Sequence, residues 1–413
     1  MSKVRAAVVV DAYGPAKHYT PYFKNAGYEM VHVQSTPAPL PALTKFDERL
    51  YLENIVFNGN LSDLVDVLKR YQVECVFPGI EPGVELADQL SETIGVSSNG
   101  TRLSQFRRNK YLMIEHLKSL GIDTPKQICS DKLSKIKDWL DENNIYPIVL
   151  KPKDSAGSDN VVICHTFEDV KIAFNNIIKS TNIMGKYNDE VLVQEFLVGT
   201  EYVVNTVSCE GHHFVSDIWK CNKTLLSGKG FIYDSELLVD FDEALVPSLE
   251  KYVKTVLTGL GITVGPCHAE VMITKRGPVL IEVGSRMGGA VNPKAMAECV
   301  GHSQVSLAVL SYVDTKQFLE YIEKPRKLQK HSMWMGLQCP AQGYQYSSKF
   351  IEQVSNLESI FALNMRRGIG EKMPKTVDLN SSPGNANLVN HCLEKLLSDY
   401  QKIKQAFKNN IIA

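Results

Sequence analysis

The first hundred residues alternate short apolar runs with stretches of helical periodicity. A β-branched run at 6–10 ends in Asp-Ala-Tyr-Gly-Pro, and a second apolar run follows at 30–33. Apolar residues at helical spacing predict a helix at about 61–71, and the run at 75–78 opens into the turn Gly-Ile-Glu-Pro-Gly-Val-Glu. Strands that alternate with helices predict a small doubly wound α/β domain around a parallel sheet.

The pattern changes after an amphipathic helix at 107–120, which Gly121 and a Thr-Pro pair end. Apolar runs at 145–152, 160–166 and 190–196, with a helix at about 168–179, predict a small antiparallel α+β subdomain.

Later runs predict a larger second half. Strands are expected at 201–209 and 212–220, a helix at 250–260, and a hairpin of 267–274 with 277–285 around Lys275-Arg276-Gly277. A helix near 303–312, short strands around 333–339 and a C-terminal helix at about 388–406 follow. The predicted parts are an N-terminal α/β domain at 1–107, a linker helix region at 108–124, a central subdomain at 125–197 and a C-terminal domain at 198–413.

Composition narrows the class of protein. At 413 residues and 44% hydrophobic, the chain is long enough for two or three cores with a cleft between them. Lys and Arg number 45 against 46 Asp and Glu, so no excess charge attracts nucleic acid or an anionic membrane. Nine cysteines without a Cys-x-x-Cys pair indicate a reducing, cytoplasmic compartment, and no run is long enough for a signal or a membrane span. Small-molecule partners are expected, and a homodimer is left open.

The first candidate for chemistry is Lys151, which ends an apolar strand before a turn of small residues. No Walker A, His-Glu-x-x-His or Gly-x-Gly-x-x-Gly motif is present, so phosphate binding would need scattered cations. A lysine here can meet a phosphate while the turn presents backbone N–H groups to other oxygens. The alternative is a hairpin loop with a surface lysine. The turn residues are Ser155, Ala156, Gly157 and Ser158.

The second candidate is the run 191–204, in which Gln194 and Glu195 interrupt an apolar strand. Backbone groups of 195–197, which include Phe196 and Leu197, could read an adenine edge, and Glu201 could accept from ribose hydroxyls. An edge strand with solvent-facing carboxylates is the alternative.

The third candidate is the hairpin, where Glu270 and Glu282 each interrupt a strand of Val, Ile, Leu and Met. Such carboxylates are costly without a cation, and the turn places them nearly opposite each other, so both could bind Mg²⁺. Arg286 adds a positive fork suited to a transferring phosphoryl group. His268 shares a strand face with Glu270 and could contact substrate or orient a carboxylate. An ordinary ion pair and a buried, satisfied histidine are the alternatives.

Taken in order, these pieces resemble the ATP-grasp superfamily over about residues 1–300. The pieces are Arg-Asn-Lys at 108–110, Lys151 with its loop, Gln194-Glu195-Phe196-Leu197, Glu201, Glu270, and Glu282 with Arg286. The resemblance implies that Lys110 and Lys151 hold ATP phosphates, that 195–197 binds adenine through its backbone, and that Glu201 binds ribose. An acyl-phosphate intermediate must be kept from water, so the central subdomain with its loop at 154–158 is expected to act as a lid.

The resemblance further implies two metal ions, Mg²⁺ or Mn²⁺, held by Glu270 and Glu282, with Arg286 stabilising an acyl phosphate and the tetrahedral adduct. Many members carry Glu-x-Asn after the last strand, with asparagine as a further ligand, whereas this chain has Gly284 there. That puts the ligands of the second metal in doubt. Gly-Pro-x-His-x-Glu at 265–270 and Glu-x-Gly-x-Arg-x-x-Gly-Gly at 282–289 look more like the L-amino acid ligase branch.

We therefore expect an ATP-dependent carboxylate–amine ligase that joins two amino acids and releases ADP and phosphate. Within the same architecture, the alternative is ligation of a non-amino-acid carboxylate or amine in nucleotide or cofactor biosynthesis. From other classes, the N-terminal domain could belong to a dinucleotide-dependent oxidoreductase or to a non-catalytic nucleotide-binding module.

Overall fold

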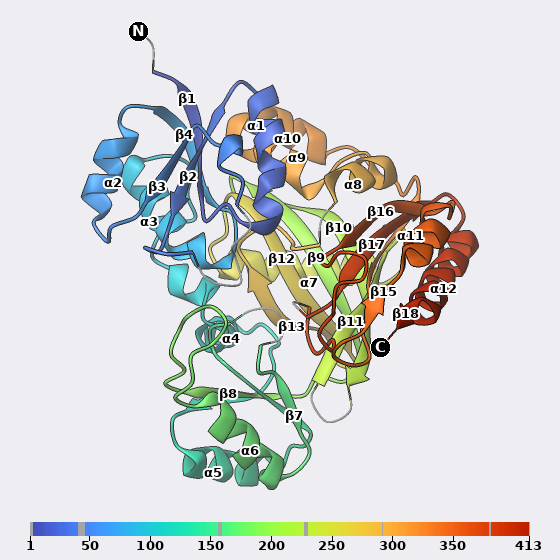
Figure 1. Ribbon diagram of the computed structural model, residues 1–413. Coiled ribbons are helices and arrows are strands. Elements are labelled where there is room, and N and C mark those ends of the chain that lie inside the picture. The colour runs from blue at the N-terminus through green and yellow to red at the C-terminus, as the bar shows by residue number, and fades with distance from the viewer. Residues whose placement is uncertain are drawn as a thin grey trace.

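The computed structural model describes residues 3–39, 46–155, 159–226, 230–290, 292–379 and 381–412. Three sheets with their covering helices make up most of the molecule (Figure 1). No helix in these ranges is long and apolar enough to cross a bilayer.

The N-terminal part is a four-stranded parallel sheet of order β3-β2-β1-β4, which confirms the predicted α/β fold. Strand β1 (Arg5–Val10) is buried on both faces: Ala7 and Val9 join one hydrophobic cluster, and Val8 joins another. The other elements are η1 (Gly14–His18), α1 (Tyr19–Asn25), β2 (Glu29–Gln34), η3 (Glu48–Leu50), β3 (Glu53–Val56), α2 (Leu61–Leu68), β4 (Gln72–Pro78), η4 (Glu81–Gly83), α3 (Val84–Ile94) and η5 (Ser104–Arg107).

The small subdomain, in green at the bottom of Figure 1, is an antiparallel sheet of order β5-β8-β6-β7 covered by two helices. Its antiparallel α+β character is as predicted. Thr166 and Asp169 form a capping box that begins its second helix. Its elements are β5 (Gln127–Ser130), α5 (Leu133–Asn143), β6 (Ile148–Lys151), β7 (Val162–Cys164), α6 (Phe167–Ile177) and β8 (Val191–Glu195).

The largest part is an eight-stranded antiparallel sheet of order β13-β12-β9-β10-β11-β14-β17-β16. Its strands are β9 (Thr200–Cys209), β10 (His212–Leu226), β11 (Gly230–Leu238), β12 (Gly265–Thr274), β13 (Gly277–Gly284), β14 (His331–Gly336), β16 (Ile360–Met365) and β17 (Gly384–Asn390). The associated elements are α4 (Lys110–Ser119), α7 (Val246–Gly259), α8 (Pro293–Val300), α9 (Gln304–Val313), α10 (Thr315–Ile322), α11 (Ser348–Ser355), α12 (Leu393–Asn409), and a small pair of β15 (Gln345–Tyr346) and β18 (Ile411–Ile412).

The expected hairpin is confirmed, but the C-terminal prediction was partly wrong. Residues 388–390 are strand rather than helix, because β17 pairs on both sides with β14 and β16. Backbone pairing in the centre of a sheet outweighs the local preference of a short segment. The strands of the last hundred residues therefore extend the sheet that carries the predicted metal carboxylates.

The two faces of this sheet differ along β12. Ala269 and Val271 are buried against α4 and α7, whereas His268, Glu270 and Met272 line the opposite side. The alternation is the period of two that a half-buried strand requires. The polar face is thus directed at the centre of the molecule.

Candidate active site

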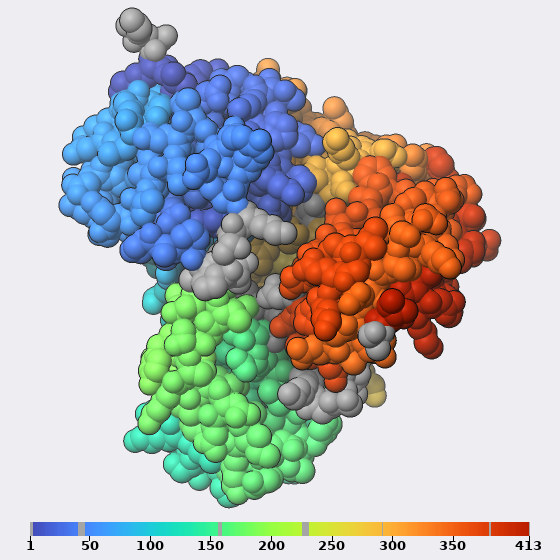
Figure 2. All heavy atoms as spheres, viewed as in Figure 1, coloured from blue at the N-terminus to red at the C-terminus, as the bar shows by residue number. Residues whose placement is uncertain are grey.

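A cavity of about 2040 Å³ lies where the three parts meet, and Figure 2 shows the surface recessed there. Its floor is the polar face of the eight-stranded sheet. The strand register places the floor residues side by side across the sheet: Met272 opposite Glu201, Glu236 between Cys221 and Trp334, and Asn387 between Trp334 and Ala362. Side chains from residue 201 to residue 387 therefore share one cavity.

Glu270 and Glu282 lie directly opposite each other on β12 and β13. Lys110 Nζ is 2.8 Å from Glu282 Oε2, and His268 Nε2 is 3.8 Å from Glu270 Oε1. Burial favours a raised pKa for Glu270, but His268 and the nearby lysines outweigh it and lower that pKa to about 2. His268 Nδ1 also contacts Asn205 Oδ1 at 2.8 Å, which orients the imidazole toward Glu270.

These carboxylates suit a hard divalent cation by the chemistry of their donor atoms, because both present oxygen to the cavity. Within the described ranges, no group of three or more His, Cys, Asp or Glu side chains is arranged to hold a metal ion. The protein's contribution to a metal site here is thus a carboxylate pair. Gly284 supplies no side chain to it.

Lys151 ends β6 with its side chain at the cavity and only 6% of the residue exposed. Burial lowers its pKa to about 8, with Lys110 adding to the effect and Glu282 opposing it. Its amino group makes no hydrogen bond or ion pair with any residue that the structure describes. A buried ammonium without an anion is arranged to receive one.

Of the predicted loop, only Ser155 is described; Ala156, Gly157 and Ser158 lie outside the described residues. The Ser155 carbonyl accepts a hydrogen bond from Lys110 Nζ at 2.5 Å, and its hydroxyl donates to Asp159 at 2.8 Å. Lys110 therefore joins the start of the loop to Glu282.

The segment after β8 lines the cavity next to Lys151. Gln194 donates to Gln127 Oε1 at 2.8 Å, and Glu195 receives Arg276 in a bidentate pair at 2.7 and 3.0 Å. The side chain of Glu195 is thus occupied by structural contacts, while Phe196 and Leu197 stay at the cavity wall.

Glu201 lies on β9 and is 7% exposed. Lys223 Nζ is 2.6 Å from its carboxylate, and the Tyr233 hydroxyl donates to it at 3.0 Å. Burial raises the pKa of Glu201, and Lys223 opposes the rise. Neither Lys223 nor Tyr233 was predicted as a site residue, since neither belongs to a recognised motif.

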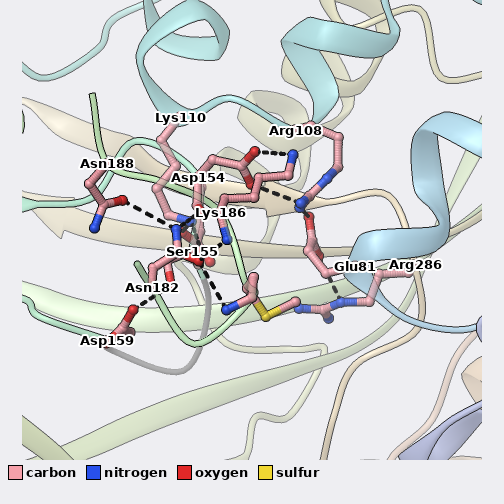
Figure 3. Close-up of polar contacts among 12 residues, drawn as sticks. Glu81, Arg108, Lys110, Asp154, Ser155, Asp159, Asn182, Lys186, Asn188 and Arg286 are labelled. Atoms are coloured by element: carbon pink, nitrogen blue, oxygen red, sulfur yellow. Dashed lines mark hydrogen bonds and ion pairs between the residues drawn. The ribbon is translucent and has the colours of Figure 1, made fainter. Parts of the chain in front are cut away.

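Arg286 lines the cavity as expected, but its guanidinium also reaches back to the N-terminal part (Figure 3). Arg286 Nε donates to Glu81 Oε2 at 2.9 Å, and Nη1 donates to the carbonyl of Met287 at 2.9 Å. Sequence reasoning read the segment around Glu81 only as a turn and so missed this partner.

Glu236 on β11 is a further cavity residue that the sequence analysis missed. Burial raises its pKa to about 8, and the neighbouring carboxylates Glu270 and Glu201 add to the effect. Asp234 and Ser235 precede it, so Glu236 does not stand out as a single carboxylate in an apolar run, as Glu270 does.

Comparisons with known proteins agree with this fold. Residues 144–294 match the family model described as an ATP-grasp domain. The chain is 35% identical over 385 residues to dapdiamide A synthase of Enterobacter agglomerans, covering 91% of this chain and 90% of that protein.

Two solved structures illustrate the shared fold. L-amino acid ligase from Bacillus licheniformis aligns with a TM-score of 0.77 at 16% identity, over 100% of this chain and 98% of that one. N5-carboxyaminoimidazole ribonucleotide synthetase from Thermotoga maritima aligns with a TM-score of 0.69 at 16% identity, over 99% of each chain.

The fold and the site together define an ATP-dependent ligase that joins a carboxylate to an amine. The chain belongs to the ATP-grasp family. These relatives leave the oxidoreductase and binding-module interpretations without support.

Proposed function

We propose that this enzyme joins two amino acids into a dipeptide, with release of ADP and phosphate. One observation carries the proposal: a single cavity of about 2040 Å³ is lined by the buried cations, the carboxylate pair and a further wall from β14, β16 and β17. A site for one small ligand measures roughly 300–1,000 Å³. The cavity has room for a nucleotide and two further substrates, and the similarity to dapdiamide A synthase and L-amino acid ligase favours amino acids.

The nucleotide is assigned to the end of the cavity next to the small subdomain. Lys110 and Lys151 would hold phosphates, helped by backbone N–H groups of the loop that begins at Ser155. Segment 194–197 would contact adenine and Glu201 the ribose hydroxyls. Lys151 is buried and forms no ion pair among the described residues, and burial lowers its pKa despite Glu282. This supports the assignment, because a phosphate would supply the anion.

Glu270 and Glu282 would hold Mg²⁺ or Mn²⁺, two ions in all, with the remaining ligands from the phosphates. Such ions, when bound, neutralise charge on the phosphates. Lys110 Nζ, 2.8 Å from Glu282 Oε2, pairs with that carboxylate. His268 would orient Glu270 through the contact that Asn205 fixes.

In the reaction, an oxygen of the substrate carboxylate attacks the γ-phosphorus of ATP, and the bond from that phosphorus to ADP breaks. The product is an acyl phosphate. The amine nitrogen of the second substrate then attacks the acyl carbon, loses a proton, and phosphate leaves. Arg286 faces the cavity to stabilise the acyl phosphate and the tetrahedral adduct, as fixed positive charge does for a developing anion.

Amino acids carry an ammonium and a carboxylate, and the far half of the cavity offers partners for both. Glu236 presents a carboxyl group to the cavity, and Arg367, which also pairs with Glu371, lies on the cavity lining. These positions support zwitterionic substrates over apolar acids or amines.

The test is phosphate release from MgATP with each proteinogenic amino acid, alone and in pairs, with mass spectrometry of the products. Phosphate and ADP with a condensed dipeptide mass would support the proposal. Glu282→Ala and Arg286→Ala should lose most activity and stay folded. No phosphate release with any of the amino acids would favour a non-amino-acid substrate. Formation of AMP and pyrophosphate would exclude the acyl-phosphate mechanism.

Cytoplasmic location and a homodimer stay predictions. All nine cysteines are free in the structure, which supports a reducing compartment.

A further inference from the structure

Glu81 connects two arginines from distant parts of the chain (Figure 3). It stands at the start of η4, just after β4, and its carboxylate accepts from Arg286 Nε at 2.9 Å and from Arg108 Nη1 at 2.7 Å. Its side chain is 14% exposed and does not line the cavity. Glu81 therefore acts on its neighbours rather than on a ligand.

The first arm of this cluster fixes the orientation of Arg286. Glu81 holds Nε and the Met287 carbonyl holds Nη1, so the guanidinium plane is fixed from two sides. Within the described part of the chain, Nη2 makes no hydrogen bond. Its N–H groups remain available at the cavity that Arg286 lines.

The second arm reaches the loop of the small subdomain. Arg108 Nη2 donates to Asp154 Oδ1 at 2.8 Å, and Asp154 is also paired with Lys186. The next residue, Ser155, begins the loop and accepts from Lys110. Glu81 thus holds both the cavity arginine and the base of the loop.

Gly284, at the end of the hairpin strand β13, packs directly against the ion pair of Glu81 and Arg286. A Cβ placed on Gly284 would lie 3.0 Å from Glu81 Oε2 and 3.1 Å from Arg286 Cζ. Any larger residue there would press on the ion pair. The glycine at the position where the resemblance leads one to expect asparagine therefore makes room for Glu81 and Arg286.

Electrostatics keeps Glu81 ionised. Burial alone would raise its pKa, but Arg108, Arg286 and Lys110 lower the pKa to about 2. The carboxylate is charged throughout the working range of pH, and the geometry of the two arginines is constant across it.

We infer that Glu81 is a positioning residue of the ligase, which orients Arg286 toward the reacting carboxylate and phosphate and, through Arg108, holds the base of the phosphate loop. The inference rests on the proposed function in that Arg286 faces the acyl phosphate. A neutral amide at position 81 would keep the size of the side chain and weaken both charged contacts.

The test compares Glu81→Gln with Asp88→Asn in the full-length protein. Asp88 is a matched control, because it forms a buried ion pair at 2.8 Å with Arg107, the residue before Arg108 in the sequence. Asp88 does not line the cavity. Glu81→Gln should lower kcat about 10- to 100-fold, somewhat less than loss of an oxyanion contact. Asp88→Asn should lower Tm without a comparable loss of kcat. A kcat for Glu81→Gln equal to that of the parent overturns the inference.

A double-mutant cycle separates positioning from general stability. If Glu81 acts through Arg286, Glu81→Gln should slow the Arg286→Ala enzyme far less than it slows the parent. If Glu81→Gln lowers kcat by the same factor in the parent and in the Arg286→Ala enzyme, Glu81 does not act through Arg286. Asp154→Asn, which leaves the first arm intact but weakens the pairs of Asp154 with both Arg108 and Lys186, should raise KM for ATP more than it lowers kcat. If Glu81→Gln fails to fold, Glu81→Asp, which keeps the charge on a shorter side chain, replaces it in the cycle.

A parent enzyme that makes no dipeptide would refute the proposed function rather than the role of Glu81. The second arm is then measured by calorimetric titration with MgADP. Weaker binding by Glu81→Gln and Arg108→Lys, but not by Asp88→Asn, supports it. Equal affinity in all three overturns it.

Discussion

Replacing Lys151 with methionine should stabilise the ligand-free protein at neutral pH while it removes ATP-dependent turnover. The buried ammonium that would bind phosphate lowers the folding stability of the ligand-free protein. Methionine has a similar length and carries no charge, so it keeps the packing at the end of β6 and removes the cost of burying the ammonium.

The magnitude follows from the pKa of Lys151, which burial lowers from its ordinary value of 10.5 to about 8. The unfolded chain holds this proton more tightly than the folded chain, so the cost is complete below pH 8 and declines as pH rises toward 10.5. The full difference corresponds to about 3 kcal/mol, and at pH 9.5 about 1 kcal/mol remains. Lys151→Met should therefore gain most stability at acidic to neutral pH.

The measurement is the free energy of unfolding from denaturant titrations at pH 6.5 and 9.5, with EDTA and without nucleotide. Lys118→Met, at an exposed position of α4, is the control and should show no such difference between the two pH values. An equal effect of Lys151→Met at both pH values, or a larger gain at pH 9.5, would refute the reasoning. Retained MgATP turnover would refute the assignment of Lys151 to the phosphates.

Three further changes test other parts of the site. Burial raises the pKa of Glu236 to about 8, so the folded state loses stability as pH rises from 4.5 to 8. The Tm of Glu236→Gln relative to the parent should therefore increase over that interval and then stay constant. A Tm difference that does not change with pH would contradict this. A Cβ on Gly199 would lie 2.1 Å from the Ile273 carbonyl oxygen, so Gly199→Ala should cost about 1–3 kcal/mol in denaturant titrations and weaken ATP binding; unchanged stability would show that the backbone adjusts freely. Arg276→Ala removes the exposed pairs to Glu195, so the unfolding free energy should change by at most about 1 kcal/mol while calorimetry shows weaker MgADP binding; unaltered binding would contradict a role in holding the small subdomain.

The sequence predicted those parts of the fold whose signals are local. The β-branched run of β1, the helical pattern of α6 and the alternation along β12 are each signals carried by neighbouring residues. All three elements formed as expected. The opposition of Glu270 and Glu282 followed from the length of one turn.

What the sequence left out depends on pairing between distant segments. The continuation of the sheet from β11 to β14 joins residues about a hundred positions apart, and no local pattern encodes that choice. For the same reason Glu81 was not recognised, since its partners Arg108 and Arg286 lie 27 and 205 positions away. Glu236 was missed for another reason: it follows Asp234 and Ser235 and so does not stand out as a lone carboxylate in an apolar run.

The unbroken sheet from β13 to β16 limits how substrate selectivity can change in this enzyme. Exchanging residues 331–390 for those of a relative would replace β14, whose backbone pairs with β11, and disturb the strand that carries Glu236. In a chimaera made at that junction, the new strand would have to pair with β11 in the correct register before the cavity could bind a substrate. Variation of single side chains, such as Trp334 and Asn387 on the cavity face of the same strands, leaves the ladder intact. Mutant libraries that seek new amine substrates should therefore vary those positions rather than exchange the whole segment.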